Sequence, residues 1–233
     1  MIDSVSPTGK QIVLTFDDAC RSHLDTVAPL LRRHGFGATF FITRFNDEWR
    51  AKNGETLLGP SDVRALADMG FEIGNHTWSH ASGMDAMDAA SAAEEIDRVD
   101  RWFADAGVPA PDLYAYPGGP YSAQGETLIR ARGYKCARSC VVRAWNPATD
   151  DPFRIPAIPV TEKGDWDLFR AYAEARPDLV PAGTLPVFVF HGVPDRVHPW
   201  VNTEVGTFEA FIDFVAGLGV RCTGLGAALR ERQ

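Results

Sequence analysis

The chain has 233 residues, of which 45% are hydrophobic, and it carries a formal net charge of −8. This length fits one α/β barrel or two small domains, and the apolar content is ample for a large core. The acidic balance and the lack of a long basic run argue against nucleic acid or an anionic membrane as partners. A sugar or another neutral polar substrate is compatible with this composition.

Strand-like and helix-like segments alternate along the chain, as is typical of a parallel α/β architecture. In chain order the patterns predict a strand at 11–16, a helix at 22–34, a strand at 38–42, a helix at 61–69, a strand at 71–74, a helix at 88–105, a strand at 113–116, a helix at 123–132, a strand-like segment at 134–142, a short proline-flanked segment at 154–160, a helix at 165–175, a strand at 186–190, a helix at 204–217 and a last strand at 220–223. Since no repeat, linker or low-complexity stretch interrupts them, we expect one domain. A barrel and an open doubly wound sheet both remain possible, because both place their sites at the carboxyl ends of strands.

No export or membrane segment is visible in the sequence. The chain begins with polar residues and Pro7 rather than an apolar signal core, and it lacks a run of about 18 apolar residues. Its four cysteines form no CxxC pairs, which favours free thiols in a reducing compartment. We therefore expect a cytoplasmic protein without a membrane span, or a secreted one if a leader has been removed.

Two adjacent carboxylates, Asp17 and Asp18, follow the first apolar strand directly. If the chain turns there, one can bind a metal and the other can take a proton from water. The alternative is a helix cap with an acidic first turn for the helix at 22–34.

His76 and His80 follow the third strand and are four residues apart, which would place them on one side of a helical turn. Neutral imidazoles at this spacing commonly bind Zn²⁺, and one carboxylate with two histidines leaves open positions for water and substrate. The absence of a glutamate between them excludes the HExxH motif, and a pair of surface histidines is the alternative.

A histidine and a glycine turn complete the set of candidates. His191 follows the most apolar strand and is either a general acid or a core histidine bonded to a carbonyl. Asp195 is placed to orient it. The turn that contains Pro117 and Gly118 allows a backbone N–H to approach an oxyanion closely.

The order of these motifs resembles the polysaccharide deacetylase family (carbohydrate esterase family 4, with its NodB-type homology domain). Thr-Phe-Asp-Asp comes first, then His-Thr-x-x-His, a proline-centred turn, and a histidine after an apolar strand. The resemblance runs over about residues 11–223 and includes the Ala-Thr-Phe-Phe-Ile strand at 38–42 and the Gly-Phe-Glu-Ile-Gly-Asn-His-Thr run at 70–77. It implies a single-domain distorted (β/α) barrel with seven or eight strands, spanning residues 1–233.

The resemblance also implies a chemistry. The metal ligands would be Asp18, His76 and His80, and the metal is a divalent ion, with Zn²⁺ expected first and Co²⁺, Mn²⁺ or Ni²⁺ as alternatives. Water activated at the metal would attack an acetamide carbonyl and release acetate. The remaining roles are a general base at Asp17, a general acid at His191, and oxyanion or substrate contacts from Tyr116, Pro117 and Gly118.

Several positions depart from the family pattern. The usual glycine after the Asp pair is Ala19, and the usual arginine before the proline turn, which orients the base, is Ala115. An expected acidic motif near 139–145 is absent. We hypothesise that Arg138 reaches Asp17 from the neighbouring strand and restores the pairing.

The expected partner is a small carbohydrate or glycoconjugate carrying an N-acetyl group. One alternative keeps the fold and hydrolyses a non-sugar linear or cyclic amide, as allantoinase-like relatives do. Another is a sugar-binding pseudoenzyme that contains a metal. A non-haem iron oxygenase shares the ligand types, but its usual all-β fold conflicts with the α/β pattern.

Overall fold

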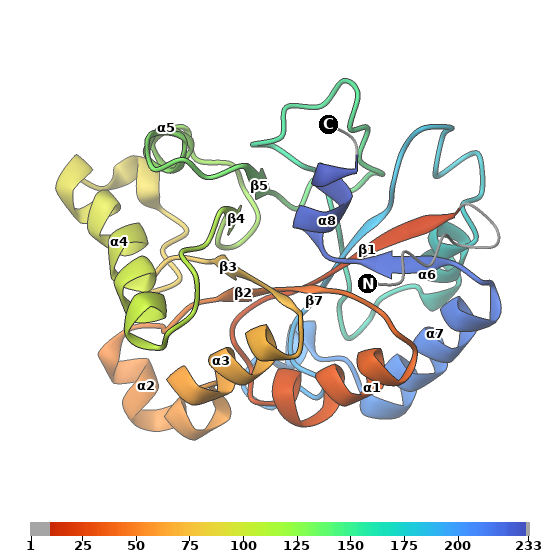
Figure 1. Cartoon of the computed structure of the whole chain (residues 1–233), viewed down its shortest axis with the longest axis horizontal. Coiled ribbons are helices and arrows are strands. Elements are labelled where there is room, and N and C mark those ends of the chain that lie inside the picture. Colours follow the sequence, from red (N-terminus) through yellow and green to blue (C-terminus); the bar gives the residue numbers. More distant parts are fainter. Residues whose placement is uncertain (1–9, 232–233) are drawn as a thin grey trace.

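The computed structural model describes residues 10–231 as one α/β domain (Figure 1). Its strands are β1 (Gln11–Phe16), β2 (Thr39–Ile42), β3 (Glu72–Asn75), β4 (Leu113–Ala115), β5 (Cys136–Arg138), β6 (Ile158–Pro159), β7 (Val187–Phe190) and β8 (Arg221–Thr223). Its α-helices are α1 (Ala28–Arg33), α2 (Asp47–Asn53), α3 (Pro60–Asp68), α4 (Ala89–Asp105), α5 (Ala123–Ala131), α6 (Trp166–Ala173), α7 (Val205–Gly217) and α8 (Leu225–Arg230). Shorter helical turns are η1 (His23–Val27), η2 (Gly54–Thr56), η3 (Met84–Ala86) and η4 (Pro199–Val201).

Within residues 10–231, no helix has the length and apolar character needed to cross a membrane. The first residues of the chain, on which the prediction of localisation depends, lie outside this range.

The strands form one parallel sheet in the order β5-β4-β3-β2-β1-β7-β6, and β8 pairs with the start of β1. Residues 155–159 connect the two ends of this strand order. Ile155 forms a bridge to Arg138 of β5 at one end, and β6 pairs with β7 at the other. The sheet therefore curls into a distorted barrel, as the family resemblance implied.

Both faces of β1 are covered, which explains why its apolar run is continuous. Leu14 and Phe16 belong to the outer core under the helices, whereas Val13 belongs to the core inside the barrel. Because successive residues on a strand point to opposite faces, the next inward position after Val13 and Thr15 is Asp17. The alternation that builds the core thus brings a carboxylate to the barrel mouth.

Aromatic rings hold the outer layer together. Phe16 stacks on Phe40 and on Phe190 from the two flanking strands, and Phe208 of α7 meets it edge-on. Burying each such ring contributes about 2 kcal/mol, so the strand ends are firmly fixed. Figure 1 shows α1, α3 and α7 along one side of the sheet, while α8 lies on the other side.

The structure corrects three local expectations. The helix predicted at 22–34 begins as the π-helical turn η1 and becomes α-helical only at Ala28. The strand predicted at 134–142 ends at Arg138, because the Cys140 N–H turns back to the Gly119 carbonyl and leaves the ladder. The helices α2 and α8 were not anticipated; α2 buries no residue and therefore shows no apolar stripe.

Candidate metal and catalytic site

The two aspartates reach one site because the chain turns sharply after β1. Asp17 still extends the ladder by donating its N–H to the Phe190 carbonyl, and Asp18 and Ala19 then adopt positive φ angles of 73° and 52°. Non-glycine residues rarely occupy this region, and they persist there only when the surrounding structure imposes it. Ala19 thus adopts a left-handed conformation at the position where the family pattern has a glycine.

His76 and His80 come together in a loop rather than on the helical turn that their spacing suggested. The loop after β3 contains positive φ angles of 60° at both Thr77 and His80, and it is braced by Thr77, whose hydroxyl accepts the Ala81 N–H. The two rings meet edge-on with centroids 4.9 Å apart. The predicted juxtaposition is therefore present, although its backbone geometry differs.

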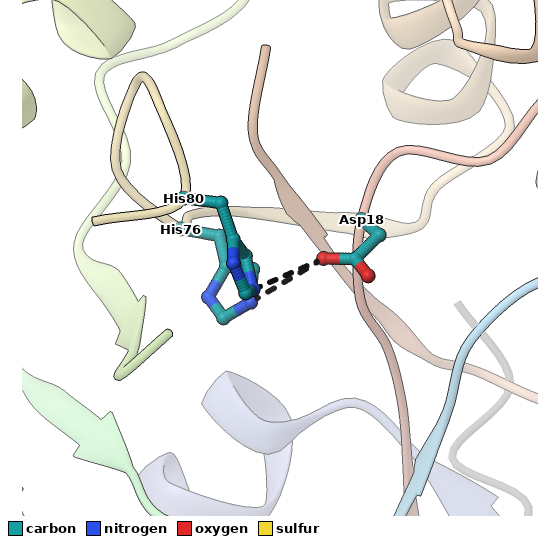
Figure 2. Close-up of side chains that lie close together, drawn as sticks. All are labelled: Asp18, His76 and His80. Carbon is teal, nitrogen blue, oxygen red and sulfur yellow. Dashed lines mark ion pairs between the residues drawn. The ribbon is translucent and has the colours of Figure 1, made fainter. Parts of the chain in front are cut away.

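Asp18, His76 and His80 form a cluster whose ligand atoms all lie within 4.8 Å of one another (Figure 2). Asp18 Oδ1 is 3.5 Å from His80 Nε2 and 3.7 Å from His76 Nε2. The Nδ1 of His76 donates to the Ala115 carbonyl at 2.8 Å, which leaves its Nε2 lone pair directed at the cluster. Asp18 Oδ1 is buried and has no hydrogen-bond partner among residues 10–231. The donor set and this unsatisfied oxygen fit a divalent cation.

Burial controls the charge states of these ligands. It lowers the pKa of His76 to about 3 and also lowers the pKa of His80, so both imidazoles are neutral and able to bind a metal near pH 7. Burial raises the pKa of Asp18 to about 6, and the neighbouring His191 opposes this shift. A bound cation would favour the ionised form of this carboxylate.

Asp17 is held by Arg138, as hypothesised from the sequence. Arg138 Nη2 donates to both carboxylate oxygens, at 2.6 Å to Oδ1 and 2.5 Å to Oδ2, and the arginine side chain is fully buried. Burial raises the pKa of Asp17, but the Arg138 guanidinium and the adjacent imidazoles outweigh it and bring the pKa below its usual range. Arg138 is the register partner of Ala115, so the guanidinium that holds Asp17 comes from the strand next to the position where the resemblance led us to expect an arginine.

The third histidine, His191, also lies beside Asp18, with Nε2 3.9 Å from Asp18 Oδ2. Its carbonyl accepts a hydrogen bond from Nε2 of the fully buried His23, a contact that the sequence did not suggest. The predicted orienting residue Asp195 instead pairs with His198 at 3.4 Å, because its carboxylate also accepts the Val197 and His198 backbone N–H groups. The expectation that Asp195 orients His191 is therefore corrected.

His198 also belongs to the site, although the sequence gave it little weight. Its Nδ1 is 4.0 Å from Asp18 Oδ2, and its ring stacks on Trp49. The adjacent Asp195 carboxylate raises the pKa of His198. The Asp-x-x-His spacing at 195–198 was the available signal. A cavity of about 340 Å³, lined by Trp49, Leu57 and Arg196 among others, opens beside Asp18 and His198.

The glycine turn after β4 lies at the same end of the barrel. Gly118 and Gly119 have positive φ angles of 70° and 93°, which explains the need for glycine there. The Gly118 N–H has no acceptor among residues 10–231. Tyr116, by contrast, is buried and donates its hydroxyl to the Phe153 carbonyl. Its contact with the oxyanion or the substrate stays a prediction.

Known proteins show both sequence and structural similarity to this chain. One curated relative, an uncharacterized 30.6 kDa protein of Geobacillus stearothermophilus, is 33% identical over 76 residues, which is 32% of this chain and 25% of that protein. This chain thus matches only a quarter of the relative's length.

Three solved structures share the fold. A family 4 carbohydrate esterase from Streptomyces lividans, solved with acetate, has a TM-score of 0.61 and 22% identity, covering 93% of this chain and 92% of that one. Bacillus subtilis PdaA, another family 4 carbohydrate esterase, has a TM-score of 0.61 and 19% identity, covering 96% and 82%. A Bacillus anthracis pseudoenzyme of the same family has a TM-score of 0.63 and 16% identity, covering 94% and 65%.

The family model for polysaccharide deacetylases matches residues 4–137, more than half of the chain. This stretch includes the paired aspartates, the two histidines of the cluster and the glycine turn. The chain belongs to the polysaccharide deacetylase family.

Proposed function

We propose that this protein is a metal-dependent hydrolase that removes acetyl groups from an N-acetylated sugar, oligosaccharide or glycoconjugate. The observation that carries the proposal is the convergence at one barrel mouth of a carboxylate–imidazole cluster and a second carboxylate held by a buried guanidinium. Family membership supports it, as does the fold shared with a carbohydrate esterase solved with acetate.

Asp18, His76 and His80 would hold the cation. A divalent ion at this position, with Zn²⁺ as the first candidate before Co²⁺, Mn²⁺ or Ni²⁺, supplies Lewis-acid polarisation of the carbonyl and lowers the pKa of water. Neutral imidazoles and an unsatisfied carboxylate oxygen are the features of this chain that favour such binding.

The other groups would handle protons and charge. Asp17, kept ionised by Arg138, would take the proton from the attacking water. His191, whose Nε2 is 3.9 Å from Asp18 Oδ2, would give a proton to the leaving amine. The unbonded N–H of Gly118 would donate to the developing oxyanion, which is often the largest single contribution to such a reaction.

The decisive experiment is acetate release from a panel of N-acetylglucosamine oligomers, before and after chelation, with Zn²⁺ or Co²⁺ added back. We expect chelation to abolish release and metal to restore it. Asp17→Asn is the matched control, because it preserves shape; it should lower kcat by roughly 10²–10⁴-fold while metal content is retained. Release that persists after complete chelation, or in Asp17→Asn at the full rate, would refute the proposed mechanism.

Two alternatives would follow from a negative result. If the protein binds one metal but releases no acetate, hydrolysis of linear and cyclic non-sugar amides is tested next. A metal-containing, sugar-binding pseudoenzyme is the remaining alternative. Ala115 in place of the expected arginine favours it, and the intact Asp17–Arg138 pair opposes it.

A further inference from the structure

Arg138 contacts the Asp17 carboxylate through one nitrogen only. Both hydrogen bonds come from Nη2, whereas a fork-to-fork pair uses two nitrogens. A single shared nitrogen leaves the guanidinium plane free to pivot about the carboxylate. Arg138 Nε is buried without a partner among residues 10–231 and does not prevent this rotation.

The second arm of the guanidinium is fixed by Cys140. Arg138 Nη1 donates to Cys140 Sγ at 3.2 Å, and the guanidinium also lies over the Phe41 ring, 5.3 Å from its centroid. The carboxylate, the thiol and the ring thus all contact the guanidinium. Of these contacts, only the thiol holds Nη1.

Cys140 also supports the glycine turn. Its N–H donates to the Gly119 carbonyl, and its Cβ and Sγ would lie 2.6 and 2.9 Å from any Cβ added at Gly119. On the other side of the turn, the Tyr116 N–H donates to the Arg138 carbonyl. The turn that carries the Gly118 N–H is therefore bonded to the same strand end that holds Asp17.

We propose that Cys140 is a positioning residue for the reaction: it sets the orientation of Arg138 on Asp17 and the place of the Gly118–Gly119 turn together. Its thiol does not meet the substrate, and it acts through the groups on either side. The inference rests on the proposed function, because it assigns a role within that reaction.

The test compares Cys140→Ala, Cys140→Ser and the control Cys136→Ala by acetate release. Cys136 lies on β5, four residues before Cys140; it is fully buried, whereas Cys140 is partly exposed, and it makes no contact with Arg138 or the glycine turn among the side-chain contacts of residues 10–231. In Cys140→Ala, loss of one hydrogen bond should lower kcat about two- to tenfold, with KM and metal content unchanged. Cys140→Ser should recover most of kcat, since a hydroxyl can accept the Arg138 hydrogen bond, and Cys136→Ala should keep the full rate. An unchanged kcat in Cys140→Ala overturns the proposal, as does an equal loss in Cys136→Ala.

A measurement without substrate separates this inference from the proposed function. Urea midpoints of the wild type, Cys140→Ala, Arg138→Lys and the double variant form a double-mutant cycle. A double variant that loses less than the sum of the single variants supports the contact, and strict additivity overturns the proposal. If the wild type releases no acetate, the proposed function fails while this cycle still decides whether the thiol holds the arginine.

Discussion

His23 should make the stability of this protein depend on pH in a calculable way. Its imidazole is fully buried between Phe16 and Phe40, donates Nε2–H to the His191 carbonyl, and has no partner for Nδ1 among residues 10–231. Burial lowers its pKa from 6.5 to about 4. His23 therefore binds a proton below about pH 6.5 in the unfolded chain, but only below about pH 4 in the folded chain.

Because the unfolded state binds more protons in this window, stability falls as the pH falls from 6.5 to 4. The pKa difference corresponds to roughly 3 kcal/mol in total, of which about 2 kcal/mol is already lost at pH 5. His23→Gln removes the titration and keeps an N–H donor for the His191 carbonyl. Its free energy of unfolding should therefore decrease less than that of the wild type between pH 7 and pH 5, by about 2 kcal/mol.

Urea unfolding at pH 7 and pH 5, on metal-free protein, measures this difference. His34→Gln is the matched control, because its imidazole is partly exposed beside Asp213. If wild type and His23→Gln lose the same free energy on acidification, the reasoning about a neutral buried imidazole is wrong.

Three further predictions concern the site and the layer beneath it. Metal affinity, measured by calorimetry, should weaken as the pH falls through about 6, because a proton then competes with the metal for Asp18; a constant affinity down to pH 5 would contradict this. Tyr116→Phe should lower the free energy of unfolding in urea by about 1 kcal/mol and leave kcat unchanged, because the hydroxyl bonds to the Phe153 carbonyl. A large loss of kcat would mean that this hydroxyl contributes to the reaction. Gly74→Ala should destabilise the fold by about 1–3 kcal/mol in the same assay, since its Cβ would lie 2.5 Å from the Phe41 ring; a neutral effect would mean that this ring moves freely.

The alternation of apolar strands with helices predicted a parallel α/β architecture whose site lies at the carboxyl ends of the strands, and the family resemblance implied the barrel. This pattern located the Asp17–Asp18 turn and His191 without tertiary information. The sequence also predicted that His76 and His80 lie close together, but it predicted a helical turn for their backbone. A spacing of four residues does not distinguish a helical turn from a loop with two positive φ angles.

The remaining misses arise from tertiary contacts. Nothing near His23 in the sequence indicates that its ring reaches the His191 carbonyl, since that contact joins residues 168 positions apart. Asp195 was assigned to the wrong histidine because its backbone turn directs the carboxylate toward His198.

The register of Ala115 opposite Arg138 has a consequence for how relatives of this chain are interpreted. Neighbouring inward positions on adjacent parallel strands open onto the same volume, so a charge can migrate between strands during evolution while its target stays in place. A motif residue that is missing from one strand can therefore have its counterpart at the paired position of the adjacent strand. Searching the adjacent strand at the paired position would separate members that have lost the guanidinium from those that supply it from another part of the chain.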